Sequence, residues 1–419
     1  MRKIILILFL SISFLNLFSQ QDSVLKNFKF RNSNYRAITM NIGGGSNFSN
    51  TELVSGSNKN HNSSGSAGAS YYANKSTDRI LFNMSGGLYG SFSAGRSKNS
   101  SDDDKNRNLS FAPNFSILNK WFSRKFFTEL GADMSAQSYN SKSTDISPLS
   151  EQKNKRNNQS LAIIAGIGKG RLENITDMQN ALWLNKGLEK EGRLSRTLSA
   201  GELNGLGRAI TAANNTRVLD ARKRTQFILE TIDGYFQQNG LINKTDIKYF
   251  SNLNDIVFFA FNEPRLSGTE TFIRLRPAIT NFSDNNSRQP ADEKTGSRAT
   301  SWSALLSMGV SKYVPMNLKH QNNYGASLRL YYFSNHSNEK FYTSGILINE
   351  FDFNPELRQA GVALFFQHAI YPNTRTIISF RLDSETGYQD VGDESGFFWN
   401  SQSYRFIELL YQLPHPLYL

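Results

Sequence analysis

The segment 109-LSFAPNFSI-117 alternates apolar residues with small or polar ones. Successive side chains of a β-strand point to opposite faces, so one face of this segment is apolar and the other is polar. This pattern is typical of a half-buried strand in a soluble protein, or of a transmembrane β-barrel strand between lipid and a polar lumen. The same alternation recurs in other segments, including Ile80–Phe92, Leu130–Ala136 and Ile378–Leu382.

The N-terminal residues, 1–20, have the pattern of a secretory signal peptide. Arg2 and Lys3 precede the apolar run Ile4–Leu17, and a cleavage zone follows at 18–20. The run is shorter than the roughly 20 apolar residues that a membrane-spanning helix needs. No other stretch approaches its length. Since every backbone polar group must be paired in lipid, a secreted and membrane-inserted chain of this kind is expected to form a β-barrel.

The composition excludes several classes of function. The chain has no cysteine, so it has no disulfide, no thiolate metal site, no thiol nucleophile and no residue to carry a lipoprotein anchor. The formal net charge is +12, but lysine and arginine are scattered along the chain, and no nucleic-acid partner is expected. The 17 tyrosines and 31 phenylalanines fit aromatic girdles at two membrane interfaces.

The alternation predicts a mainly β fold, a transmembrane antiparallel up-and-down β-barrel of about 12 strands. The expected strands are 35–47, 65–75, 78–96, 106–121, 124–140, 155–169, 267–283, 299–313, 319–335, 358–371, 374–389 and 398–413. The segment Lys340–Phe353 is an alternative further hairpin, which would bring the count to about 14. The competing fold is a secreted β-sandwich, but its strands would be shorter, at about five or six residues.

The connections between these strands indicate the orientation. The odd-numbered connections, such as Phe48–Ser64 and Ser141–Asn154, are long and mostly polar, whereas most even-numbered ones are tight turns. Outer-membrane barrels have long loops outside the cell and short turns in the periplasm. An even number of strands therefore places both termini in the periplasm, and the expected location is the bacterial outer membrane with its lipids as partners.

One even-numbered connection is much longer than the others. From Gly170 to about Pro264 the apolar period changes from two to 3.6, which predicts helices at about 175–191, 200–213 and 217–238, and a fourth helix that Thr245 caps. Ser199 and Glu202 form a capping-box pair before the second helix. Residues 21–169 and 265–419 are then two barrel halves, and residues 170–264 are a helical insert on the periplasmic side.

Three roles are open for this insert. It is a plug of the lumen, a dock for another periplasmic or outer-membrane protein, or a stalk that stabilises the barrel rim. The basic run Arg222, Lys223 and Arg224 is a candidate contact for an acidic partner or a lipid headgroup, although such a run is more often a solvated helix face. The linkers between the helices lack the carboxylate spacing of a calcium loop.

Three segments carry a resemblance to a known group of proteins. They are 170-GRLENITDMQNALWLNKGLEKEGRLSR-196, 215-NTRVLDARKRTQFILETIDGYFQQNG-240 and 371-YPNTRT-376. By these motifs the chain resembles uncharacterised outer-membrane barrels of Bacteroidota. The resemblance covers the insert and the C-terminal barrel half. It implies an outer-membrane location and brings no active residues with it.

Charged residues on the polar faces of the strands are expected to point into the lumen, because a charge on the lipid face costs about 2–4 kcal/mol near the midplane. In a channel they would form a charge ladder that filters solutes, and in a closed barrel they would form ion pairs that hold it shut. Both readings remain open. The residues are Glu129, Asp133, Arg274, Arg276, Arg329 and Arg381.

No enzyme class is indicated by the sequence. An outer-membrane lipid hydrolase would require a histidine and a serine that face outward on adjacent strands near the outer leaflet. The run Asp102–Asp104 is typical of a solvated loop tip, with weak cation or lipopolysaccharide bridging as the alternative. No catalytic residue, cofactor or metal site is predicted. The expected function is a non-enzymatic barrel subunit of an envelope assembly, and the alternative is a narrow diffusion channel for small hydrophilic solutes.

Overall fold

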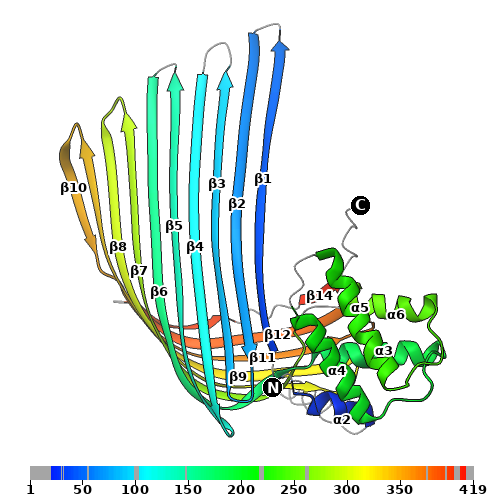
Figure 1. Ribbon diagram of the computed structural model, residues 1–419. Helices are drawn as coiled ribbons and strands as arrows, with labels where there is room; N and C mark the ends of the chain where they lie inside the picture. Colours follow the sequence, from blue (N-terminus) through cyan, green and yellow to red (C-terminus); the bar gives the residue numbers. More distant parts are fainter. Residues whose placement is uncertain are drawn as a thin grey trace.

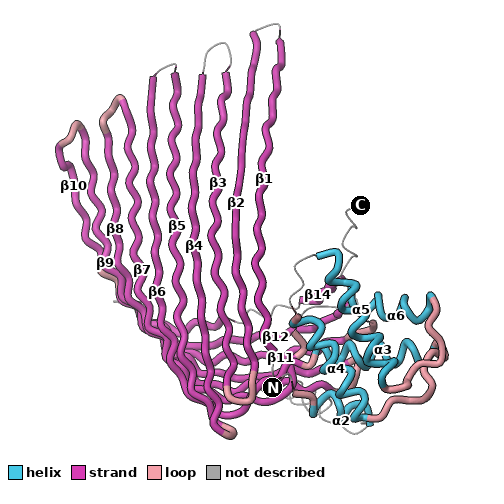
Figure 2. Tube along the Cα trace, in the orientation of Figure 1, coloured by secondary structure: helices cyan, strands magenta, loops and turns pink. Residues whose placement is uncertain are grey.

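The chain folds into one antiparallel sheet and one group of helices (Figure 1). The computed structural model describes residues 20–29, 31, 33–53, 56–98, 103–146, 149–216, 221–259, 264–373, 376–391, 394–400 and 406–411. The expected signal peptide lies outside these residues, apart from Gln20. Figure 2 shows the helices gathered beyond one end of the sheet. The predicted mainly β, up-and-down class with a helical insert between the sixth and seventh strands is confirmed.

Consecutive strands are neighbours along nearly the whole sheet. The strands are β1 (Ser33–Leu53), β2 (Gly56–Ser76), β3 (Ile80–Lys98), β4 (Asp103–Ser123), β5 (Phe126–Ile146), β6 (Leu149–Asn174), β7 (Leu266–Gln289), β8 (Glu293–Pro315), β9 (His320–Thr343), β10 (Ile346–Phe353), β11 (Glu356–Ile370), β12 (Thr376–Val391), β13 (Glu394–Asn400) and β14 (Phe406–Tyr411). The path β1–β9, β11, β12, β13 has 12 members, while β10 and β14 pair off this path with β9 and β12.

The path has the predicted number of strands, but the expected strand 398–413 is not one strand of it, because its described residues belong to β13 and to β14, which pairs off the path. The alternative hairpin at Lys340–Phe353 also exists, between β9 and β10. Its turn residues Ser344 and Gly345 have φ angles of 50° and 76°. Two consecutive positive φ values are the geometry of a tight type I′ hairpin. Among the described residues, the edge strands β1 and β13 each pair with one neighbour, so closure into a barrel stays a prediction.

The prediction of long polar loops is wrong at several connections. β1 and β2 pair without interruption from Ser33 opposite Ser76 to Leu53 opposite Gly56, through the whole of the expected loop Phe48–Ser64. β5 and β6 likewise continue to the pair Ile146 and Leu149. Ladder hydrogen bonds join backbone groups and do not require apolar side chains. A strand that is polar on both faces therefore lacks the alternation from which the sequence prediction was made.

The two faces of the curved sheet differ in chemistry. On the outer face, apolar side chains stand exposed at alternate positions; Leu130 and Met134 of β5, for example, are 52% and 51% exposed. Neighbouring strands continue this apolar belt with Leu88, Phe111, Ile163, Leu275, Trp302, Leu328, Leu364 and Leu382. The inner face bears mostly small, polar and charged side chains. A continuous exposed apolar surface of this kind marks contact with lipid or protein.

The helical insert has its own apolar core. It contains α3 (Thr176–Lys190), α4 (Ala200–Asn215), α5 (Ala221–Gln238) and α6 (Ile247–Phe259). The Ser199–Glu202 capping box is confirmed at the start of α4. The predicted cap of the fourth helix is wrong by one residue, because Asp246 and not Thr245 accepts from the first backbone N–H groups. None of the helices in the described part of the chain is long and apolar enough to cross a membrane.

A fifth helix, α2 (Gln20–Asn27), belongs to this core although the sequence analysis assigned its residues to the sheet. Val24, Leu25 and Phe28 are 4%, 1% and 2% exposed and pack in one cluster with residues such as Leu206 and Phe236. Burying one such side chain contributes roughly 1.5–3 kcal/mol. The N-terminal segment is therefore bound to the insert before it enters β1.

Candidate functional site: the junction between the insert and the inner face

The helices lie beside one end of the sheet and border the inner face there (Figure 1). A cavity of about 700 Å³ is lined at once by helix residues, among them Asp177, Asn214 and Ile232, and by inner-face strand residues, among them Lys120 and Glu270. Its strand residues come from β1, β2, β3, β4, β6 and β7. The insert thus lies at the end of the sheet that carries the β2–β3, β4–β5 and β8–β9 turns, and forms one wall of this cavity.

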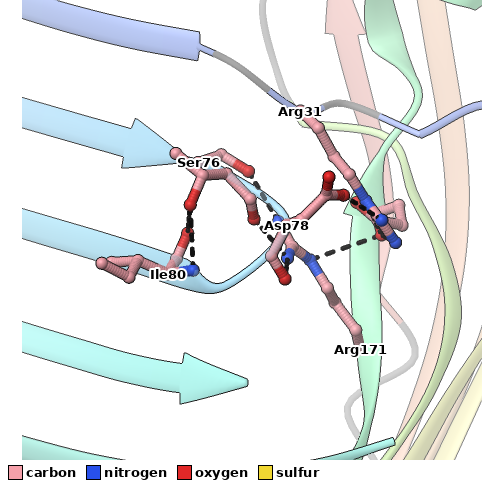
Figure 3. Close-up of polar contacts among 7 residues, drawn as sticks. Arg31, Ser76, Asp78, Ile80 and Arg171 are labelled. Atoms are coloured by element: carbon pink, nitrogen blue, oxygen red, sulfur yellow. Dashed lines mark hydrogen bonds and ion pairs between the residues drawn. The ribbon is translucent and has the colours of Figure 1, made fainter. Parts of the chain in front are cut away.

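An arginine–carboxylate cluster fastens the N-terminal segment to this rim (Figure 3). Arg31 pairs with Asp78 in the β2–β3 turn, and its Nη2 lies 3.1 Å from Glu173 Oε1 at the end of β6. Arg171 donates to Ser76 Oγ and to the carbonyl of Thr77, each at 2.7 Å. The hydrogen bond and charge of Arg31 lower the pKa of Asp78, so this carboxyl group stays ionised. Three distant parts of the chain meet in this cluster.

A second anchor lies where the chain leaves the insert. Arg265 is 1% exposed, and its guanidinium donates to the carbonyls of Asn317, Leu318 and His320 in the β8–β9 turn. Its Cζ lies 4.5 Å from the ring centroid of Tyr371. The backbone N–H of Ile175 donates to the Arg265 carbonyl at 2.7 Å, which joins the first and last residues of the insert. Charge-assisted bonds of this kind, in a buried site, hold the insert in one position.

A buried charge cluster lies on the inner face above the cavity. Glu129, whose side chain is 0% exposed, contacts Arg274 Nε at 2.5 Å and Lys120 Nζ at 3.6 Å. Lys120 also pairs with Glu270 at 2.7 Å. Glu129 and Arg274 were predicted from the sequence as inner-face charges, whereas Lys120 and Glu270 were not. Lys120 lies four positions from the inner-face residue Ser116 on β4, and Glu270 lies four positions from the inner-face residue Arg274 on β7. Residues an even number of positions apart on a strand point to the same face, so the alternation would have placed both on the inner face.

The other predicted inner charges are also paired. Arg276 lies 3.2 Å from Asp133, Arg329 lies 3.4 Å from Glu385, and Arg381 lies 2.7 Å from Asp383. The last two pairs line a further cavity of about 440 Å³ between β7, β8, β9, β11 and β12. All six residues selected from the sequence therefore have a partner of opposite charge. This arrangement matches the ion-pair reading better than a ladder of unpaired charges.

The basic run on α5 is divided in the structure. The side chain of Arg222 lies outside the described side chains, whereas Lys223 and Arg224 are exposed. Arg224 lines the cavity between the insert and the inner face. It therefore faces the sheet of its own chain. Lys223 is the described member of the run that does not line this cavity.

Asp177 and Glu202 of the insert have pKa values shifted in opposite directions. Asp177 lines the cavity and is buried, and this burial raises its pKa although Thr211 and Asn214 donate hydrogen bonds to it. Glu202 has its pKa lowered to about 2 by Arg196 and by the capping bonds of Ser199. Burial disfavours a carboxylate, whereas donors to the charged form favour it. Asp177 is therefore a carboxyl group of the insert that burial favours in its protonated form.

The structure brings histidine and serine together at one place. His61 Nε2 lies 3.1 Å from Ser63 Oγ and 3.4 Å from Ser46 Oγ, and its ring stacks on Phe48. All four residues lie on the outer face of β1 and β2, as a lipid hydrolase would require. Within the described residues, however, no carboxylate or amide contacts the His61 ring to orient it, and an activated nucleophile needs such a group. No group of three metal-ligating side chains occurs in the part of the chain that is described.

The comparisons with known proteins do not place the chain in a family. Neither a protein-family model nor a curated protein matches the sequence. Among solved structures, the chain is similar to the translocator domain of the autotransporter NalP from Neisseria meningitidis, with a TM-score of 0.26 and 8% sequence identity. The match covers 88% of this chain and 86% of that one. At this level of similarity the comparison adds no argument about function.

Proposed function

We propose that this protein is a non-enzymatic outer-membrane β-barrel whose helical insert is a fixed lid over the periplasmic mouth of the lumen. The observation that carries the proposal is the cavity of about 700 Å³ with helices on one side and inner-face strand residues on the other. A stalk that only stabilised the rim would leave this space open. In this arrangement the insert is the floor of the lumen.

Placement in a membrane is supported by the outer face of the sheet. In a soluble protein its exposed apolar side chains would contact water, which costs a free energy of about 25 cal/mol per Å² of apolar surface. Lipid removes this cost, and the inner face keeps the charges away from hydrocarbon. Periplasmic placement of the insert is supported by the polar hairpin extensions at the opposite end of the sheet, such as β1–β2 through 48–64, because outer-membrane barrels carry their longer polar segments outside the cell.

The anchors at the rim favour a static lid over a moving gate. Arg265 and the Arg31 cluster connect the insert and the N-terminal segment to turns of the sheet. Closely paired inner charges further join β4, β5 and β7 through Lys120, Glu129 and Arg274. Opening the lumen at this end would require the buried bonds of Arg265 and the partly exposed bonds of the Arg31 cluster to break together.

Conductance in planar bilayers tests the lid. We expect the intact protein to be silent, and a variant in which a short glycine–serine linker replaces Thr176–Phe259 to conduct. Lys223→Ala is the matched control, because this side chain is exposed and does not line the cavity, and it should stay silent. Conductance by the intact protein would favour the alternative of a diffusion channel for small hydrophilic solutes. Silence of the linker variant, once its correct insertion is shown, would contradict the lid.

A second candidate function is docking of another envelope protein on the insert. The observation that favours it is on α6, where Ile247 and Phe250 are 86% and 46% exposed. They are three residues apart and so lie on one face of the helix. Affinity capture with the intact chain and with an Ile247→Ser, Phe250→Ser variant tests this role. Lys248→Ala is the control, and capture of the same proteins by all three forms would contradict docking.

A further inference from the structure

The outer face of the sheet bears a group of cations beyond the apolar belt. This basic row consists of Arg107, Lys142, Lys153, Lys155 and Lys294, all exposed. We propose that it binds the phosphates of a phosphorylated glycolipid of the outer leaflet, of the lipid A class. The inference rests on the proposed outer-membrane location but not on the lid.

The strand register places these cations unusually close together. Arg107 of β4 lies directly opposite Lys142 of β5, and Lys142 lies directly opposite Lys153 of β6. Ser287 of β7 continues this line to Lys294 of β8. Side chains directly opposite each other on one face have Cβ atoms about 4.5–5.5 Å apart, and like charges in such pairs repel. An anion bound across the row would relieve this repulsion.

The acidic residues nearby neutralise only part of the row. Glu151 lies 2.7 Å from Lys142 and 2.5 Å from Lys153, and Asp292 lies 3.3 Å from Lys294. Among the residues that the structure describes, no carboxylate pairs with Arg107 or Lys155. The row therefore has more cations than carboxylates, and at least two of its cations are available to an external phosphate.

The apolar neighbours of the row indicate that the anion is part of an amphiphile. The row lines a groove of about 950 Å³ together with Phe92, Leu109 and Tyr342. Phe92 and Leu109 lie directly opposite each other and are the last belt residues of β3 and β4. Leu109 is two positions from Arg107 on the same strand, so an apolar and a cationic site lie about 7 Å apart. In a bound lipid of this class, the acyl chains would contact the apolar site along the belt and the phosphates would contact the cationic site at the row.

Lipid binding by the purified, full-length protein tests the proposal. The probe is lipid A titrated into detergent micelles and followed by native mass spectrometry. For a variant with Arg107→Gln, Lys142→Gln and Lys153→Gln we expect the dissociation constant to rise about tenfold or more, since each surface cation contributes about 1 kcal/mol to anionic lipid binding. The matched control removes three exposed cations at the other end of the strands, with Arg79→Gln, Arg124→Gln and Lys125→Gln, and should bind as the parent does.

Two further measurements separate the outcomes. Dephosphorylated lipid A should bind the parent about as weakly as lipid A binds the row variant, and inorganic phosphate should not displace lipid A. Equal binding of lipid A by the parent, row variant and control would overturn the site, as would displacement by phosphate alone. If the protein does not insert into membranes at all, the proposed function fails instead. The variant removes opposed like charges together with the exposed ion pairs of Glu151, so it should fold with a stability close to the parent's without lipid.

Discussion

At the scale of single residues, the inner face pairs charged side chains of opposite sign, and leaving a buried one without its partner would cost folding free energy. Glu129 is enclosed between Lys120 and Arg274, and its side chain is 0% exposed. By contrast, the side chains of Arg381 and Asp383 are 55% and 39% exposed, so water screens that pair. The same residue types therefore contribute very differently to stability, and burial decides which pairs matter.

Glu129→Gln tests this difference. It leaves Lys120 and Arg274 close together without the carboxylate between them, and we expect a loss of about 3–5 kcal/mol in the free energy of unfolding. Asp383→Asn is the control and should cost about 0–1 kcal/mol because its pair is exposed. Urea unfolding of the detergent-solubilised protein measures both. Equal losses for the two variants would contradict the buried cluster.

Asp177 gives the insert a dependence on pH. Its pKa is raised, so above about pH 4 the unfolded chain ionises before the folded one and the insert loses stability as pH rises. Asp177→Asn removes this penalty while its amide oxygen can still accept from Thr211. We expect the variant to melt higher than the parent at neutral pH, and the two to converge below about pH 4. Thermal unfolding of the helices, followed by circular dichroism, measures this.

Glu202 is a control for Asp177, because its pKa is shifted in the opposite direction. Its pKa is lowered to about 2, so its stabilising effect is complete above the unfolded pKa of about 4.3 and is lost as pH falls toward 2. Glu202→Gln should therefore lower the melting temperature at neutral pH and have no effect at the acid end. A parallel pH profile for the Asp177 and Glu202 variants would contradict both assignments.

At the scale of elements, the helices are positioned by contacts that join distant segments. α2 is short, yet Leu25 is 1% exposed within the insert core. Tyr235 of α5 donates to the Glu202 carbonyl at 2.7 Å, which connects α5 to the first turn of α4. The sequence analysis located α3–α6 by their period of 3.6 but did not assign α2, because eight residues after a signal-like run have too few apolar positions to define a period.

Leu25→Ala tests whether α2 belongs to the insert. Removing this buried side chain should cost about 2–5 kcal/mol and make the insert more susceptible to limited proteolysis. Lys29→Ala, which changes an exposed side chain a few residues away, should leave the cleavage pattern unchanged. If Leu25→Ala also has no effect on cleavage of α3–α6, the N-terminal segment does not stabilise the insert.

At the scale of the whole molecule, the sheet separates two environments. Apolar side chains are exposed on the outer face, and charges are paired on the inner face. We expect Leu130→Arg, on the outer face of β5, to lower the yield of folding into lipid vesicles, with a cost of about 2–4 kcal/mol near the bilayer midplane. Gln137→Arg, an inner-face change on the same strand, should fold with the parent's yield. Equal yields would contradict the membrane placement of the outer face.

The sequence by itself determined the faces and the periods. Alternation in segments such as Leu109–Ile117 depends on local geometry, since neighbouring side chains of a strand always point apart. The period of the insert and the Ser199–Glu202 capping box are local in the same way. These features predicted the order of strands, the inner charges and the place of the helices.

Only the tertiary structure decided how these parts meet. The pairing of Lys120 with Glu270 spans 150 residues of sequence, and the Arg31 cluster joins the N-terminal segment to β6. The extension of β1 and β2 through a polar segment, the cavity between the insert and the inner face, and the alignment of Arg107, Lys142 and Lys153 depend on contacts between distant segments. Register and burial are set by neighbours far along the chain, and no local pattern of residue types encodes them.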